Sequence, residues 1–215
     1  MRKIINKHKL LWLQKDFSWS CVMGVVFLAG SLLFNHLISA YVDRSAGAYV
    51  QDIFLDNLPV FNVDWIINDA VIIFTIFVVG YAIINPHKIP FIFKSMALFI
   101  GIRSIFITLT HLGPAPIRTY LDPNDLLINL NNGRDMFFSG HTGLPFLLAL
   151  IFWEDKLMRY VSLGASFVFG GAVLLGHLHY SIDVFAAFFI TYSIFHLAHK
   201  LFPEDRNLFN EKNEI

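Results

Sequence analysis

The sequence at residues 17–42 reads FSWSCVMGVVFLAGSLLFNHLISAYV and contains no Asp, Glu, Lys or Arg. A helix needs about 20 mostly apolar residues to cross a bilayer, and this run is longer than that. The core of a signal peptide has only about 7–15 apolar residues, so the run is too long to be one. We therefore expect a retained membrane-spanning helix over residues 17–41.

The composition of the whole chain agrees with a membrane protein. Of its 215 residues, 56% are hydrophobic and 15% are charged, whereas an average soluble domain has about 25% charged residues. The mean hydropathy is +0.59. Such a chain is not disordered, and its formal net charge of zero gives no cationic face for nucleic acid. The single cysteine, Cys21, excludes an intrachain disulfide and a cysteine-rich metal site.

Further apolar stretches predict five more spans, at residues 65–84, 89–110, 136–153, 160–176 and 180–201. The expected fold is an all-α integral membrane protein, a bundle of six transmembrane helices. Its expected parts are a basic cytoplasmic or interfacial N-terminus at 1–16, a six-span catalytic membrane domain at 17–201 and a cytoplasmic C-terminal tail at 202–215.

The distribution of positive charge predicts the orientation. With the N-terminus inside, 12 Lys and Arg residues fall in the inner segments and three fall in the outer loops, with Arg103 inside a span. Because Lys and Arg accumulate on the cytoplasmic side of membrane proteins, we expect both termini in the cytoplasm.

A few polar residues lie where lipid-facing residues are expected. Ser139, Gly140 and His141 begin the fourth predicted span. Ser139 is a suitable helix cap, and a helix N-terminus binds anions through its free N–H groups. Taken alone, this stretch is also consistent with a simple cap next to an interfacial histidine.

The sixth predicted span begins with His179 and Asp183. Residues four apart share one face of a helix, so we expect the carboxylate to contact the imidazole. That contact fixes the tautomer and makes the other ring nitrogen a better nucleophile or base. A buried pair with only a packing role is the alternative.

Topology is expected to bring these residues together. The fourth and sixth spans both begin on the outer side, and Arg103 lies about 10 Å below the outer end of the third span at 1.5 Å per residue. Two histidines, an aspartate, an arginine and a helix N-terminus together favour a phosphate-handling site. A zinc site made of His141, His177, His179 and Asp183 is the competing interpretation. It is disfavoured because histidines two apart on a helix point away from each other.

Two motifs then resemble a known family. The sequence RDMFFSGHT at 134–142 is similar to Gly-Asp-x-x-x-Ser-Gly-His-Thr, and HYSIDV at 179–184 is similar to His-Tyr-Thr-x-Asp-Val. Both are motifs of the sphingomyelin synthase family, within the type 2 phosphatidic acid phosphatase superfamily. The resemblance extends over about residues 50–200. Arg134 departs from it, because the family has glycine there.

The resemblance implies a ping-pong transfer of a phospho-alcohol head group from a glycerophospholipid donor to ceramide or a diacylglycerol-like acceptor. His179 would be the nucleophile, Asp183 would orient it, and His141 would be the general acid and base. The residues expected at the phosphate and head group are Arg103, Arg134, Asp135, Ser139, Gly140 and Tyr180. No metal or organic cofactor is required, and the site would face the exoplasmic side.

Several alternatives stay open at this point. A lipid phosphatase or a phospholipase C uses the same His-His-Asp site with water as the acceptor. A transporter or a membrane scaffold is the other class, but it would need a polar path across the bilayer rather than polar residues in one leaflet. The sequence leaves open the donor head group, the acceptor and whether the protein forms a homo-oligomer.

Overall fold

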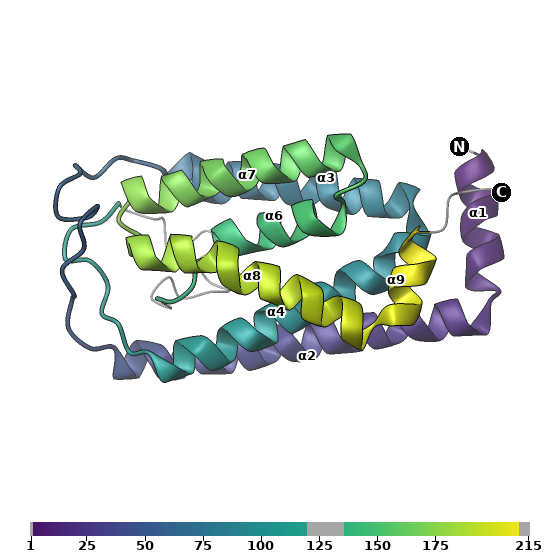
Figure 1. Ribbon diagram of the computed structural model, residues 1–215, viewed down its shortest axis with the longest axis horizontal. Helices are drawn as coiled ribbons and strands as arrows, with labels where there is room; N and C mark the ends of the chain where they lie inside the picture. The colour runs from purple at the N-terminus through teal and green to yellow at the C-terminus, as the bar shows by residue number, and fades with distance from the viewer. Residues whose placement is uncertain (1, 120–135, 211–215) are drawn as a thin grey trace.

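The computed structural model describes residues 2–119 and 136–210, and in these ranges it is a bundle of helices (Figure 1). In chain order the elements are α1 (Arg2–Trp12), α2 (Lys15–Ser45), η1 (Ile66–Ala70), α3 (Val71–Ile84), η2 (Pro86–Lys88), α4 (Ile89–Leu109), α6 (Gly140–Ile151), α7 (Lys156–Leu175), α8 (Ser181–Leu201) and α9 (Pro203–Asn210).

Five helical segments of the described ranges are long and apolar enough to cross a membrane. They are α2, the continuous stretch of η1 and α3, the stretch of η2 and α4, α7 and α8. The fourth predicted span, residues 136–153, is instead the shorter helix α6 with 12 residues. At 1.5 Å per residue it is about 18 Å long, shorter than the hydrocarbon core of about 30 Å. Five of the six predicted spans therefore correspond to helices that are long and apolar enough to cross a membrane, and the count of six is not confirmed.

Helix α6 is short because of how its two ends are fixed. The Ser139 hydroxyl accepts a hydrogen bond from the Thr142 N–H, and the helix starts at Gly140, four residues after the start of the predicted span. Just before it, Phe137 has a φ of 109°, which no helix allows. At the other end Phe152 is the C-cap. These local conformations leave no room for a longer helix.

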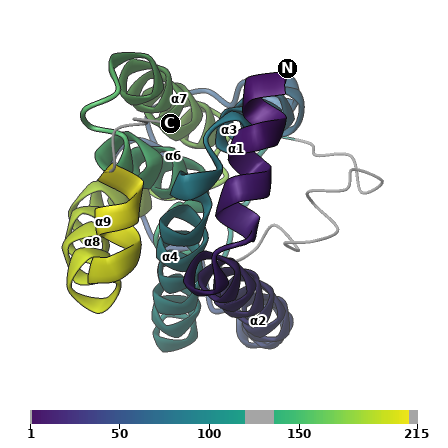
Figure 2. The same ribbon diagram turned by 90° about the vertical axis from the view of Figure 1, so that its right-hand side faces the viewer.

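The position of α6 explains how so short a helix exists in this bundle. It packs against α7, α8 and α4, and in the view along the bundle it lies among them (Figure 2). Most of its residues are buried, including Leu147, Leu148 and Ile151. Helix α6 is thus an interior element, whereas α2 packs along α4 and is otherwise largely exposed.

The two ends of the bundle differ in character. Helices α1 and α9 lie at one end (Figure 1), where the Lys94 ammonium contacts the Asp205 carboxylate at 2.6 Å and the Ser20 hydroxyl at 2.6 Å. These three residues join α4, α9 and α2. The predicted C-terminal tail therefore begins with a packed helix. We call this the α9 end, and the opposite end, where α7 ends and α8 begins, the site end.

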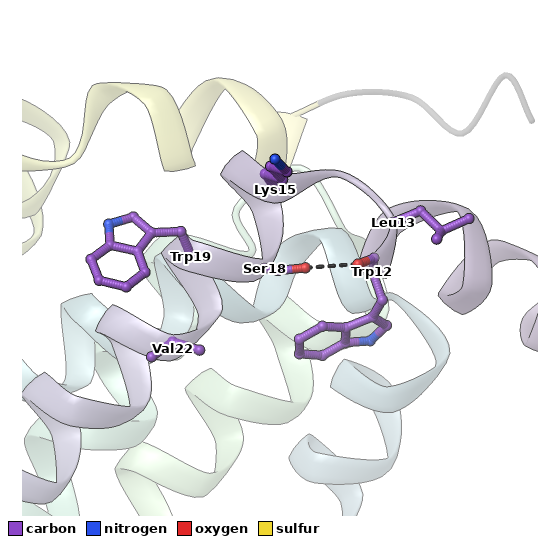
Figure 3. Close-up of a pocket in the computed structure, with 6 residues that line it drawn as sticks. All are labelled: Trp12, Leu13, Lys15, Ser18, Trp19 and Val22. Atoms are coloured by element: carbon purple, nitrogen blue, oxygen red, sulfur yellow. Dashed lines mark hydrogen bonds between the residues drawn. The ribbon is translucent and has the colours of Figure 1, made fainter.

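The α9 end also carries a surface hollow of about 470 Å³ at the junction of α1 and α2 (Figure 3). Trp12 and Trp19 flank it, Lys15 lies at its edge, and the Ser18 hydroxyl donates to the Trp12 carbonyl at 2.9 Å. Tryptophan and lysine are the usual anchors of a helix at a membrane surface. This hollow is far along the bundle from the two histidine motifs.

The close packing of α6 gives a first prediction. A Cβ at Gly143 would lie 2.6 Å from Phe99 and 2.9 Å from the Thr191 hydroxyl, and the Phe99 ring is enclosed. We expect Gly143→Ala to lower the unfolding free energy by about 1–3 kcal/mol through overpacking. Thermal unfolding in detergent measures this. The matched control is Gly171→Ala in α7, where nothing lies within 4 Å. Equal melting temperatures for the two variants would contradict the packing model.

Candidate active site

The two histidine motifs meet at the site end of the bundle. The backbone N–H of Ser139 donates to the carbonyl of Asp183 at 3.1 Å, which joins the start of α6 to the start of α8. The ring centroids of His141 and His179 lie 6.4 Å apart. At this distance one bound group can contact both imidazoles.

Asp183 contacts His179, as the sequence predicts. Its Oδ2 lies 3.3 Å from the Nδ1 of His179 and accepts a hydrogen bond from the Tyr180 N–H at 3.0 Å. The carboxylate is completely buried. Because Nδ1 faces the carboxylate, Nε2 is the ring nitrogen left for chemistry.

The reason for this contact differs from the predicted one. Helix α8 begins at Ser181, so His179 precedes the helix and does not share a helical face with Asp183. Asp183 is instead the third helical residue, and its carboxylate reaches back over the N-cap residue Tyr180 in a capping box. His177 likewise lies in the turn before α8, with a φ of 52°.

Arg103 lies next to the first motif. It is 5% exposed, and its Nε donates to the carbonyl of Phe138 at 2.9 Å. A Cβ at Gly140 would lie 3.5 Å from the same Nε. A guanidinium and the N-terminus of α6 are both positive, so placing them side by side favours an anion between them.

Aromatic rings enclose the apolar side of this site. Phe138 is fully buried and packs edge-on against Phe99 at 5.3 Å and Phe106 at 6.0 Å, between ring centroids. Phe137 stacks on Phe106 at 5.9 Å. A low-dielectric wall of this kind strengthens the attraction between an arginine and a phosphate.

Tyr180 has a role that the sequence did not reveal. Its hydroxyl donates to the carbonyl of Gly113 at 2.6 Å and accepts from the N–H of Val50 at 3.1 Å. The residue thus ties the segments after α2 and α4 to the start of α8. Its predicted contact with a head group stays a prediction.

Sequence reasoning also missed Asp52. This buried carboxylate accepts hydrogen bonds from the N–H and the hydroxyl of Ser181, both at 2.8 Å. Burial alone would raise its pKa, but the bonds from Ser181, Leu55 and Phe54 more than offset burial and hold the pKa of Asp52 below its usual value. Asp52 is therefore ionised at neutral pH.

A second hollow, of about 360 Å³, lies beside this region. Tyr49, Asp56 and His177 are its polar lining residues, and Pro59 and Pro116 are among the apolar ones. His177 is 6% exposed, and its Nε2 has no hydrogen-bond partner among the described residues.

Two predictions about the site concern a bound metal ion and the residues Arg134 and Asp135 of the first motif. Among residues 2–119 and 136–210, no group of three or more His, Cys, Asp or Glu is placed to hold a metal ion. The predicted head-group residues Arg134 and Asp135 lie outside the described residues.

The anchoring of Arg103 gives a second prediction. We expect Arg103→Met to lower the unfolding free energy by about 2 kcal/mol, because the buried Phe138 carbonyl loses a charged donor. Chemical or thermal unfolding in detergent measures the loss. Arg44→Met is the matched control, since the Arg44 Nε also donates to a carbonyl, that of Ala40, but at an exposed position in its own helix. A loss as large in the control would show that Arg103 does not anchor the motif.

Comparison with known proteins supports part of the predicted relationship. Residues 134–200 match the family model described as PAP2 superfamily C-terminal, a stretch that includes His141, His179 and Asp183 but not Arg103 or Asp52. No curated protein and no solved structure matches the chain. The match supports the type 2 phosphatidic acid phosphatase superfamily, whose members are typically enzymes acting on phosphate esters, and it does not select the sphingomyelin synthase branch.

Proposed function

We propose that this protein is a membrane lipid phosphotransferase that moves a phospho-alcohol head group from a glycerophospholipid to ceramide through a phosphohistidine. The observation that carries the proposal is the arrangement of His141 and His179 with ring centroids 6.4 Å apart and Asp183 behind His179. A nucleophile with an orienting carboxylate, facing a second proton-transfer group, is what a double displacement requires.

In the first half-reaction, the Nε2 of His179 attacks the phosphorus of the donor lipid. The new P–N bond forms as the P–O bond to diacylglycerol breaks, and His141 gives a proton to the departing oxygen. Asp183 stabilises the positive charge that develops on His179. Arg103 and the N–H groups at the start of α6 neutralise the phosphate oxygens.

In the second half-reaction, His141 removes the proton of the ceramide primary hydroxyl. The hydroxyl oxygen attacks phosphorus, the P–N bond breaks and His179 is regenerated. A hydrolase with water as the acceptor is the second candidate, because it uses the same three side chains and the matched family model is one of the PAP2 superfamily.

A transfer assay tests the function. Purified protein is incubated with fluorescent ceramide and, separately, phosphatidylcholine, phosphatidylethanolamine, phosphatidylglycerol or phosphatidylinositol, and the lipids are separated by thin-layer chromatography. We expect a new ceramide phospholipid with at least one donor. His179→Ala should abolish both the product and a phosphohistidine adduct, because no other group forms the P–N bond.

The matched control for that assay is His36→Ala, which removes an exposed histidine of α2 and should leave transfer unchanged. Diacylglycerol without a ceramide product would establish the hydrolase instead. Unchanged transfer in His179→Ala would eliminate this histidine as the nucleophile under either reaction.

The proposed orientation places the site on the exoplasmic side and both termini in the cytoplasm, following the distribution of Lys and Arg. Cys21 is buried, so we expect the native cysteine not to react with a thiol reagent, and an introduced cysteine can be labelled by itself. We expect Ile53→Cys, at a position 76% exposed next to the site end, to react with a membrane-impermeant maleimide in intact cells or right-side-out vesicles. Glu204→Cys, exposed in α9, should react only after permeabilisation. The reverse pattern would invert the topology.

A further inference from the structure

Asp52 lies in the segment between α2 and η1, and both oxygens of its carboxylate accept hydrogen bonds. Its Oδ1 accepts from the N–H groups of Phe54 at 2.9 Å and Leu55 at 3.2 Å, within its own segment. Its Oδ2 accepts from the N–H and the hydroxyl of Ser181. One oxygen therefore fixes the local turn, and the other fixes the start of α8.

The first N–H groups of a helix have no partner within the helix. At the start of α8, two carboxylates accept hydrogen bonds from N–H groups of this kind. Asp183 takes the N–H of Tyr180, and Asp52 takes the N–H of Ser181. This division leaves the Asp183 carboxylate in contact with His179, which lies two residues before Ser181.

A second contact joins the same two segments. The N–H of Val50 donates to the Tyr180 hydroxyl at 3.1 Å. Val50 and Asp52 thus bind two consecutive residues, Tyr180 and Ser181, that directly follow His179. The backbone on which the proposed nucleophile is carried is held from outside the helix by this segment.

We propose that Asp52 is a positioning residue for His179, holding residues 179–181 so that the imidazole faces His141. The expected effect of Asp52 on catalysis rests on the proposed function. Its expected effect on the structure of residues 179–181 does not. Asp52 touches no reacting group itself, so its loss should slow the chemistry without weakening substrate binding.

The test is a double-mutant cycle of Asp52→Asn and Ser181→Ala. Asp52→Asn replaces a charged acceptor and should reduce kcat about 10- to 100-fold, the effect of losing hydrogen bonds to a charged group, with KM unchanged. Ser181→Ala removes only the hydroxyl donor, so its loss should be smaller. Because the two residues act through one contact, the double variant should be about as slow as Asp52→Asn alone. Asp69→Asn, an exposed carboxylate in η1, is the charge-matched control and should keep full activity.

A second measurement separates this inference from the proposed function. Amide hydrogen exchange of the peptide covering residues 179–184 should be faster in Asp52→Asn than in the wild type, with no change in peptides from the α9 end. If the wild-type protein transfers no head group, the proposed function fails while the exchange data still test Asp52.

Three results would overturn the positioning role. The first is a wild-type kcat together with wild-type amide exchange in Asp52→Asn. The second is a double variant whose loss of kcat equals the two single losses combined. The third is a rise in KM of Asp52→Asn with kcat unchanged. If Asp52→Asn does not fold, Ser181→Ala carries the test, since it removes one hydroxyl. Wild-type kcat together with wild-type exchange in that variant would also reject the inference.

Discussion

One backbone hydrogen bond, from the Ser139 N–H to the Asp183 carbonyl, joins the two halves of the site. It places the beginnings of α6 and α8 side by side. His141 lies in the first turn of α6, and His179 lies just before α8, so joining the two helix starts brings the imidazoles together. Arg103 then reaches the same place through the carbonyl of Phe138, the residue before Ser139. Every candidate catalytic group is positioned relative to this bond.

The charges at the starts of α6 and α8 differ, and this difference bears on where the proposed phosphate would bind. The N-terminus of α8 is neutralised by two carboxylates, those of Asp52 and Asp183. Within the described residues, the side-chain cap of α6 is the uncharged hydroxyl of Ser139, and the guanidinium of Arg103 lies beside it. In the proposed reaction, the phosphate would therefore bind at α6, next to His141, and His179 would approach it from α8, whose N-terminus is neutralised.

The sequence predicts some of these features well and others for the wrong reason. Hydropathy predicts the long helices because lipid-facing surfaces must be apolar along their whole length, and the depth of Arg103 within its span predicts its meeting with the first motif. The contact of His179 with Asp183 is predicted from helical spacing, but it arises from a capping box because α8 starts at Ser181. Asp52 escapes prediction because its partner Ser181 is 129 residues away, and no periodicity encodes a contact between an irregular segment and the start of a distant helix.

The short length of α6 makes sense when its place in the bundle is considered. A helix that crosses the whole bilayer carries its N-terminus to the membrane surface, where water competes for its N–H groups. Helix α6 has 12 residues and begins further from the site end than α7 ends (Figure 1). Its N-terminal N–H groups, and His141 with them, are therefore set back into the bundle, against Phe138 and Arg103. Arg103 and Phe138 are buried there, so the arginine and the helix dipole would act on a bound anion more strongly than at a membrane surface. The same 12-residue length that departs from the predicted span thus puts the start of α6 inside an apolar bundle, where the proposed phosphate site would lie.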